Sequence, residues 1–280
     1  MTLRLVLSLC LVCIPAAGFA QQRPLVTEDP ETIGAGRILV EAGVDWGNGV
    51  EYTVSGLEGD LLRLPLIGAS VGVSSIAEIQ IDSGYNQLQI NRRDLDAPLA
   101  GMVTASGDST SAIEDIVIGT KVRLVPEGIT SPSLGFRVAT RLPNASNESG
   151  LGLDTMDFFA SVLGAKTIES VRIVGNLGVG ILSDPTRGDR QNDVLTYGAS
   201  FARALSSAAE FVGEVNGHVD TRKGPPLPGT ESRSMARFGA RYTIGGWRGD
   251  AALLVGLTSR DPGIGLAAGL TFVFDAFDLP

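Results

Sequence analysis

The feature of this sequence that most constrains its fold is a strict alternation of apolar side chains with polar or small ones. In residues 37–46 an apolar residue stands at every second position, from Ile38 to Trp46. Successive side chains of a β-strand point to opposite faces, so this period of two predicts a strand with one apolar face. Comparable runs predict twelve strands, at 37–46, 60–72, 77–90, 116–125, 133–142, 155–166, 171–182, 194–204, 209–219, 235–244, 250–258 and 264–274.

The lengths of the strands and of the connections favour a membrane barrel. Many strands have about ten residues, which is enough for a tilted strand to cross a bilayer. Long connections outside and short turns in the periplasm are typical of outer-membrane barrels. The fold class expected is therefore all-β, an antiparallel up-and-down transmembrane β-barrel of about 12 strands. A soluble β-sandwich would explain the alternation but not the alternating connections. Long connections are expected at 47–59, 91–112, 143–154, 183–193 and 220–234, short ones at 73–76, 126–132, 167–170, 205–208 and 245–249, and one short exception at 259–263.

The first twenty residues resemble an export signal. Arg4 precedes an apolar run that stops at Pro15, and small residues stand at Gly18 and Ala20. This pattern predicts a cleaved signal peptide, because a membrane anchor needs about 20 apolar residues. The expected organisation is a signal peptide at 1–20, a periplasmic lead-in at 21–36 and an outer-membrane β-barrel at 37–280. The lead-in shows little periodicity, and it either hangs in the periplasm or tucks into the barrel.

Charge and cysteine content exclude several classes of function. The formal net charge is −9, which disfavours nucleic acid as a partner. Cys10 and Cys13, the only two cysteines, lie in the predicted signal peptide, so neither a disulfide nor a thiolate metal site is expected afterwards. No cofactor and no metal are expected. The partners expected are outer-membrane lipid, a small-molecule permeant and, during biogenesis, the barrel assembly machinery of a Gram-negative cell.

The face opposite the apolar stripe carries glycine, alanine, serine and threonine with isolated charges. Small residues suit a narrow lumen, in which bulky side chains would collide. These charges are either a constriction that selects permeants by charge or an ion-paired plug that fixes the barrel. The residues predicted to line the lumen are Lys121, Arg137, Arg141, Glu214, Arg237 and Arg241.

Hairpin register predicts neighbours among these residues. Lys121 should lie opposite Arg137, and two like charges in a lumen require a carboxylate between them. Three carboxylates are candidates for this role, Glu41, Asp45 and Glu214. A hairpin centred near residue 227 would place Glu214 beside Arg241 or Thr243, and His218 beside Arg237.

The single histidine, His218, is the residue on which an enzymatic reading depends. Some outer-membrane barrels hydrolyse lipids with a serine and histidine pair. The sequence around His218 lacks the H-x-S-N-G-R type of run expected there, and no G-x-S-x-G or H-E-x-x-H motif occurs. No catalytic residue is therefore predicted.

Three stretches carry a family resemblance: Arg23 to Asp29, Gly59 to Leu66, and Arg141 to Ser146. With them the chain resembles the outer-membrane proteins grouped as the MetA pathway of phenol degradation. The resemblance implies a porin-like β-barrel transporter for small, aromatic or hydrophobic compounds, and it assigns no functional residues. The function expected is a channel or transporter. The alternatives are a closed barrel with a structural or surface-interaction role and, third, a lipid-modifying enzyme.

Overall fold

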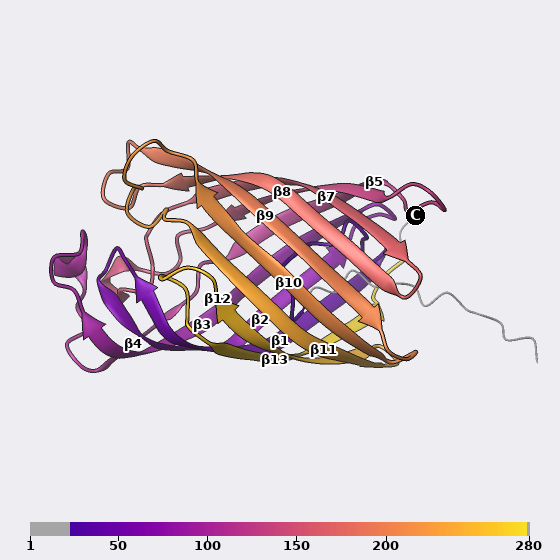
Figure 1. The fold of residues 1–280 in the computed structure, drawn as a ribbon, viewed down its shortest axis with the longest axis horizontal. Helices are drawn as coiled ribbons and strands as arrows, with labels where there is room; N and C mark the ends of the chain where they lie inside the picture. The colour runs from indigo at the N-terminus through magenta and orange to yellow at the C-terminus, as the bar shows by residue number, and fades with distance from the viewer. Residues whose placement is uncertain (1–22, 279–280) are drawn as a thin grey trace, which may run out of the picture.

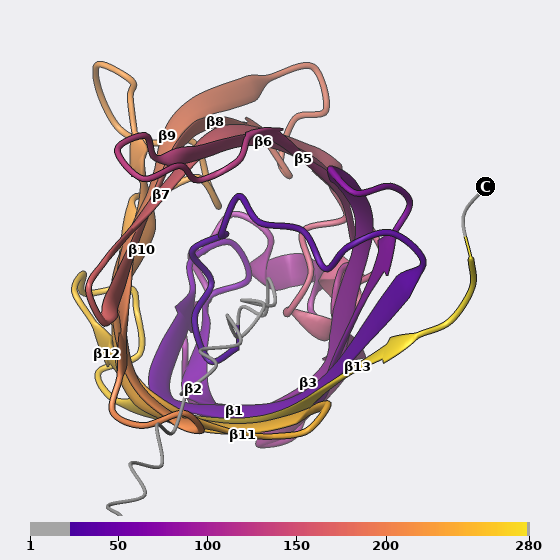
Figure 2. The same ribbon diagram turned by 90° about the vertical axis from the view of Figure 1, so that its right-hand side faces the viewer.

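Each stretch that the alternation predicts as a strand coincides with a strand of the computed structural model, which describes residues 23–278. Consecutive barrel strands pair antiparallel, and β13 pairs with β1, so the sheet closes into a barrel of twelve strands (Figures 1 and 2). The predicted fold class is confirmed, whereas the predicted signal peptide lies outside the described residues. The barrel strands are β1 (Arg37–Tyr52), β2 (Leu57–Gly72), β3 (Ala77–Arg93), β5 (Val117–Val125), β6 (Ser133–Arg141), β7 (Asp157–Ile168), β8 (Val171–Ser183), β9 (Gln191–Ala204), β10 (Ala209–Asp220), β11 (Arg233–Ile244), β12 (Trp247–Gly256) and β13 (Gly265–Asp275).

A thirteenth strand lies outside the barrel cycle. The short strand β4 (Ser109–Ile113) pairs with the second half of β3, while β5 pairs with the first half. Residues 94–108 connect β3 to β4 and contain the 3₁₀ turn η1 (Ala100–Met102). The sequence predicted this region as one long connection, and the structure adds a strand to it.

The two faces of the wall differ as the alternation predicts. Outward side chains such as Val138, Phe238 and Leu270 are 43%, 46% and 55% exposed. Inward side chains such as Lys121 and Glu214 are 0% and 3% exposed. The apolar face therefore looks outward and the charged face inward, which is the reverse of a soluble sandwich.

The connections follow the predicted alternation with one large correction. Figure 1 shows short turns at one end of the barrel, here called the turn end, and longer connections with β4 at the other, the loop end. The long loop predicted at 47–59 is wrong, because β1 and β2 continue through most of it and only 53–56 join them. The last connection, predicted as a short exception, spans 257–264. Among residues 23–278, no helix is long and apolar enough to span a membrane.

The register of one hairpin also differs from the prediction. Glu214 pairs with Arg237 and His218 with Arg233, whereas Lys121 lies opposite Arg137 as predicted. The difference arises because β10 extends beyond β11 and its last residues, Val219 and Asp220, pair only with β9. The hairpin is therefore centred before residue 227.

The described part of the lead-in, residues 23–36, lies against inward-facing side chains of the barrel. The backbone N–H groups of Val26, Thr27 and Ile33 all donate hydrogen bonds to wall carboxylates. Figure 2 shows this indigo segment inside the ring of strands. Of the two places that the sequence left open for it, the described residues occupy the barrel. We call residues 23–36 the lumen segment.

The assignment of faces predicts a pattern of chemical labelling. Lipid-soluble maleimides should react with cysteines on the outward face and not with cysteines on the inward face, because only the former meet the hydrocarbon. Equal labelling of both sets in folded protein would contradict the assignment. The outward positions are Ile118, Val138, Phe238 and Leu270, and the inward positions are Gly119, Arg137 and Arg241.

Candidate functional site

The candidate site is the barrel lumen, and the side chains of the wall bind the backbone of the lumen segment there. The Glu214 carboxylate accepts the N–H groups of Val26 and Thr27 at 2.9 and 2.8 Å. The Asn176 amide accepts the N–H of Glu28 and donates to its carbonyl, both at 2.7 Å. A segment without regular secondary structure needs such partners, because a buried backbone group without a hydrogen bond costs free energy.

A fully buried cation joins the lumen segment to the wall. The Lys121 ammonium lies 3.3 Å from Glu28 of the segment and 3.1 Å from Glu78 of β3. Arg137 lies 2.9 Å from the other oxygen of Glu28, and Gln80 donates to both carboxylates. We call these five residues the Lys121 cluster. Buried charges require partners of this kind, since removing an ion from water costs several kcal/mol.

Two further ion pairs hold the lumen segment nearer the turn end. Arg172 of β8 binds Asp29 through two nitrogens, and Arg123 of β5 binds Glu31. Ser133 donates to Glu31 at 2.9 Å. Residues 26–31 of the segment are thus anchored mainly to β5, β6, β8 and β10, whereas Arg23 reaches the other side of the lumen, 3.6 Å from Asp45 of β1.

The six residues predicted to line the lumen have different environments. Lys121 and Arg137 belong to the Lys121 cluster, Arg237 lies 2.7 Å from Glu214, and Arg241 donates to the carbonyl of Arg23 at 2.7 Å. Arg141 stands apart, because it binds Asp157 and lies 3.8 Å from Asp115. A role of these residues in passage stays a prediction.

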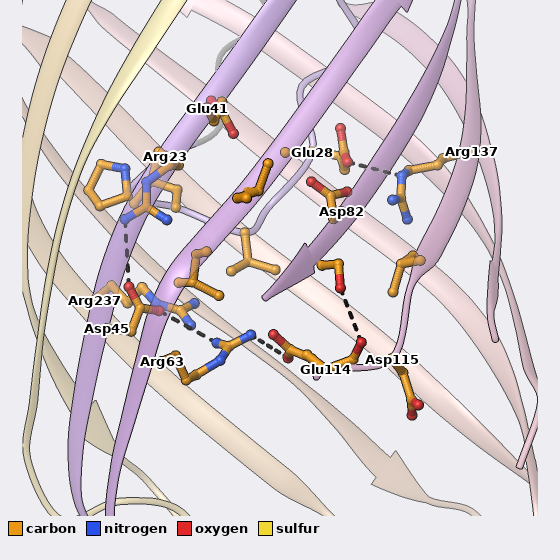
Figure 3. A pocket seen from close by; sticks show the side chains of 18 residues that line it. Arg23, Glu28, Glu41, Asp45, Arg63, Asp82, Glu114, Asp115, Arg137 and Arg237 are labelled. Atoms are coloured by element: carbon orange, nitrogen blue, oxygen red, sulfur yellow. Dashed lines mark hydrogen bonds and ion pairs between the residues drawn. The ribbon is translucent and has the colours of Figure 1, made fainter. Parts of the chain in front are cut away.

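A cavity of about 300 Å³ lies between the lumen segment and the wall formed by β1, β2 and β3 (Figure 3). Its lining is mainly charged, and in Figure 3 the labelled side chains of Arg23, Glu41, Asp82 and Arg137 surround it. We call it the inner cavity. It is the free space that the lumen segment leaves beside it.

A second cavity of about 310 Å³, the outer cavity, lies toward the loop end. Its lining mixes apolar side chains with charged ones, and it shares Asp115 with the inner cavity. Asp115 accepts the backbone N–H groups of Asn144 and Ala145 at 2.9 and 2.8 Å, which ties the following loop to the wall. Among its apolar and aromatic lining residues are Tyr52, Val54, Leu151, Leu153, Phe159 and Leu182.

His218 also lines the outer cavity. Its Nε2 atom lies 2.8 Å from the carbonyl oxygen of Glu231. Within residues 23–278, its ring has no serine or carboxylate partner of the kind that a hydrolase requires. The same part of the chain contains no group of three or more His, Cys, Asp or Glu residues arranged to hold a metal ion.

The sequence missed the carboxylates that neutralise the lumen. Glu28 and Glu78, rather than Glu41 or Asp45, approach Lys121. Glu214 does pair with an arginine, but with Arg237. A usable signal existed, because Glu28, Asp29 and Glu31 are concentrated in a stretch without periodicity, opposite a lumen predicted to be basic.

Comparison with known protein structures identifies the type of fold. No protein-family model matches the chain, and no curated protein matches it in sequence. The structure is similar to an outer membrane channel from Pseudomonas putida F1, with a TM-score of 0.61 and 12% identity over 88% of this chain and 98% of that one. It is also similar to the NanC porin, with a TM-score of 0.51 and 9% identity over 84% of this chain and 98% of that one. The chain therefore has the fold of an outer-membrane β-barrel channel.

The Lys121 cluster predicts a strong effect of one substitution. Lys121→Met leaves the buried carboxylates of Glu28 and Glu78 without their shared cation, and breaking a buried pair in this way costs about 3–5 kcal/mol. We expect the heat-modifiable folded band to disappear at a lower temperature or urea concentration. Lys166→Met is the matched control, because Lys166 pairs with Glu127 at a partly exposed site, where such a pair contributes about 1 kcal/mol or less. Equal stability of the two variants would contradict the role of the cluster.

Proposed function

We propose that the protein is an outer-membrane channel for small molecules whose lumen is partly filled by its own residues 23–36. The observation that carries the proposal is the pair of cavities, between the loop end and the lumen segment, whose linings share Asp115. A barrel with a solid core would leave no such space. The outward apolar belt supports a location in the outer membrane, with export by the predicted signal peptide.

The permeants that we propose are small molecules with an apolar or aromatic body. The outer cavity supports this class, since Tyr52, Phe159 and Leu182 can contact such a body while Arg141 and Arg233 supply polar groups. The resemblance to the MetA-pathway proteins of phenol degradation points to the same class. No enzyme activity is part of the proposal.

The competing proposal is a closed barrel without transport, with a structural or surface-interaction role. The ion pairs of the lumen segment favour it, because Glu28, Asp29 and Glu31 are all bound to basic residues of the wall. The two proposals differ in one measurable property, which is the conductance of the purified protein in a planar bilayer.

Loosening the lumen segment should increase passage. Glu214→Ala removes the acceptor of the Val26 and Thr27 N–H groups and the partner of Arg237. We expect a several-fold larger mean conductance than in the unmodified protein, while Glu169→Ala in an exposed turn leaves it unchanged. A folded Glu214→Ala barrel that conducts no more than a protein-free bilayer would favour the closed barrel.

The permeant class has its own assay. In liposome swelling, an aryl glucoside should enter faster than lactose, a disaccharide of comparable size, because only the former can use the apolar surface of the outer cavity. Equal rates would remove the preference for aromatic bodies and leave the channel itself intact.

A further inference from the structure

We propose that permeants cross the lumen beside the wall of β1, β2 and β3, and that Glu41 and Asp82 make this path favour cations over anions. The inference rests on the proposed function, and it adds the route and the charge class of the permeant. Small organic cations and neutral molecules would pass, and carboxylates and other anions would be disfavoured.

The route follows from where the lumen segment is anchored. Its ion pairs and backbone hydrogen bonds from Val26 to Glu31 go to β5, β6, β8 and β10. The inner cavity lies on the opposite side, against Glu41 of β1, Gly68 of β2 and Asp82 of β3. Arg23, at the start of the segment, reaches across to Asp45 of β1 and borders the cavity there. A molecule can therefore pass beside the flexible side chain of Arg23 while residues 26–31 keep their contacts.

Carboxylates outnumber arginines in the lining of the inner cavity. Four arginines line it, and each has a carboxylate within 4.0 Å: Asp45 for Arg23, Glu114 for Arg63, Glu28 for Arg137 and Glu214 for Arg237. Six carboxylates line it as well. Among the described residues, no lysine or arginine lies within 4.0 Å of Glu41 or Asp82, and Glu41 accepts one hydrogen bond, from Thr271 at 3.0 Å.

A glycine brings these two carboxylates to one space. Strand pairing places Glu41, Gly68 and Asp82 in a row across β1, β2 and β3. A Cβ atom on Gly68 would lie 2.6 Å from Oδ1 of Asp82 and 3.6 Å from Oε2 of Glu41. Both carboxylate groups therefore lie beside Gly68, in the space that a side chain there would fill. Asp82 is exposed to the lumen.

An excess of negative charge in a narrow pore selects for cations. Walls of low dielectric constant strengthen the field of a carboxylate compared with bulk water, and rings of Asp and Glu are a common basis of cation preference in channels. Arg23 attracts Glu41 and Arg137 attracts Asp82 at longer range, but both arginines also pair with other carboxylates, so the six carboxylates of the lining outnumber its four arginines. The preference therefore depends on Glu41 and Asp82 together.

The first test is the reversal potential of the protein in planar bilayers under a KCl gradient. The unmodified channel should prefer potassium to chloride, and Glu41→Gln combined with Asp82→Asn should lower the permeability ratio several-fold toward one. Asp96→Asn, in an exposed part of the loop after β3, is the control and should leave the ratio unchanged. An unchanged ratio in a conducting double variant would overturn the inference while leaving the proposed channel in place.

The second test follows the route without requiring conductance. In protein without Cys10 and Cys13, Gly68→Cys should react with a cationic methanethiosulfonate at least about ten times faster than with an anionic one. The two rates should converge when Glu41→Gln and Asp82→Asn are added. Gly175→Cys, exposed on the outward face, gives the background rate. Reaction at Gly68 no faster than at Gly175 would overturn the route, whereas a conductance of zero with rapid reaction would count against the channel alone.

Discussion

The burial of the Lys121 ammonium is the interaction on which the interior of this barrel depends. A cation with no exposed surface is tolerated only beside carboxylates, and one of its two partners, Glu28, comes from outside the strands. The wall alone therefore leaves Lys121 and Arg137 undercompensated. The lumen segment supplies the missing negative charge, so the same ion pairs neutralise the wall and fix the position of the segment.

The lumen segment, held by these ion pairs, divides the lumen into two unequal sides. Basic residues on β5, β6 and β8 hold the acidic residues of the segment, and the space against β1, β2 and β3 stays open. A narrow barrel can thus be stabilised by buried ion pairs and still contain a cavity beside them. The ion pairs that fix the segment and the carboxylates proposed to act on a permeant, Glu41 and Asp82, are different side chains. Substitutions can therefore change one set without changing the other.

The sequence predicted what depends on period-two alternation and missed what depends on contacts between distant segments. Strand number, face assignment and the pairing of Lys121 with Arg137 follow from local patterns. The ion pair between Glu28 and Lys121 joins residues 93 positions apart, and no local pattern encodes it. The loop predicted at 47–59 was wrong because turn-forming glycines and polar residues also occur within long strands near the loop end, where β1 has a register shift between Gly47 and Val50.

The most direct test of the account asks whether the lumen segment occupies the barrel in the folded protein. A Cβ atom on Gly198 would lie 3.4 Å from Cβ of Thr27, close to the separation that a disulfide requires. In protein without Cys10 and Cys13, Thr27→Cys with Gly198→Cys should form a disulfide on mild oxidation, and reduction should restore the conductance that oxidation lowers. A heat-modifiable, correctly folded barrel in which these two cysteines stay free and separately reactive would contradict the account.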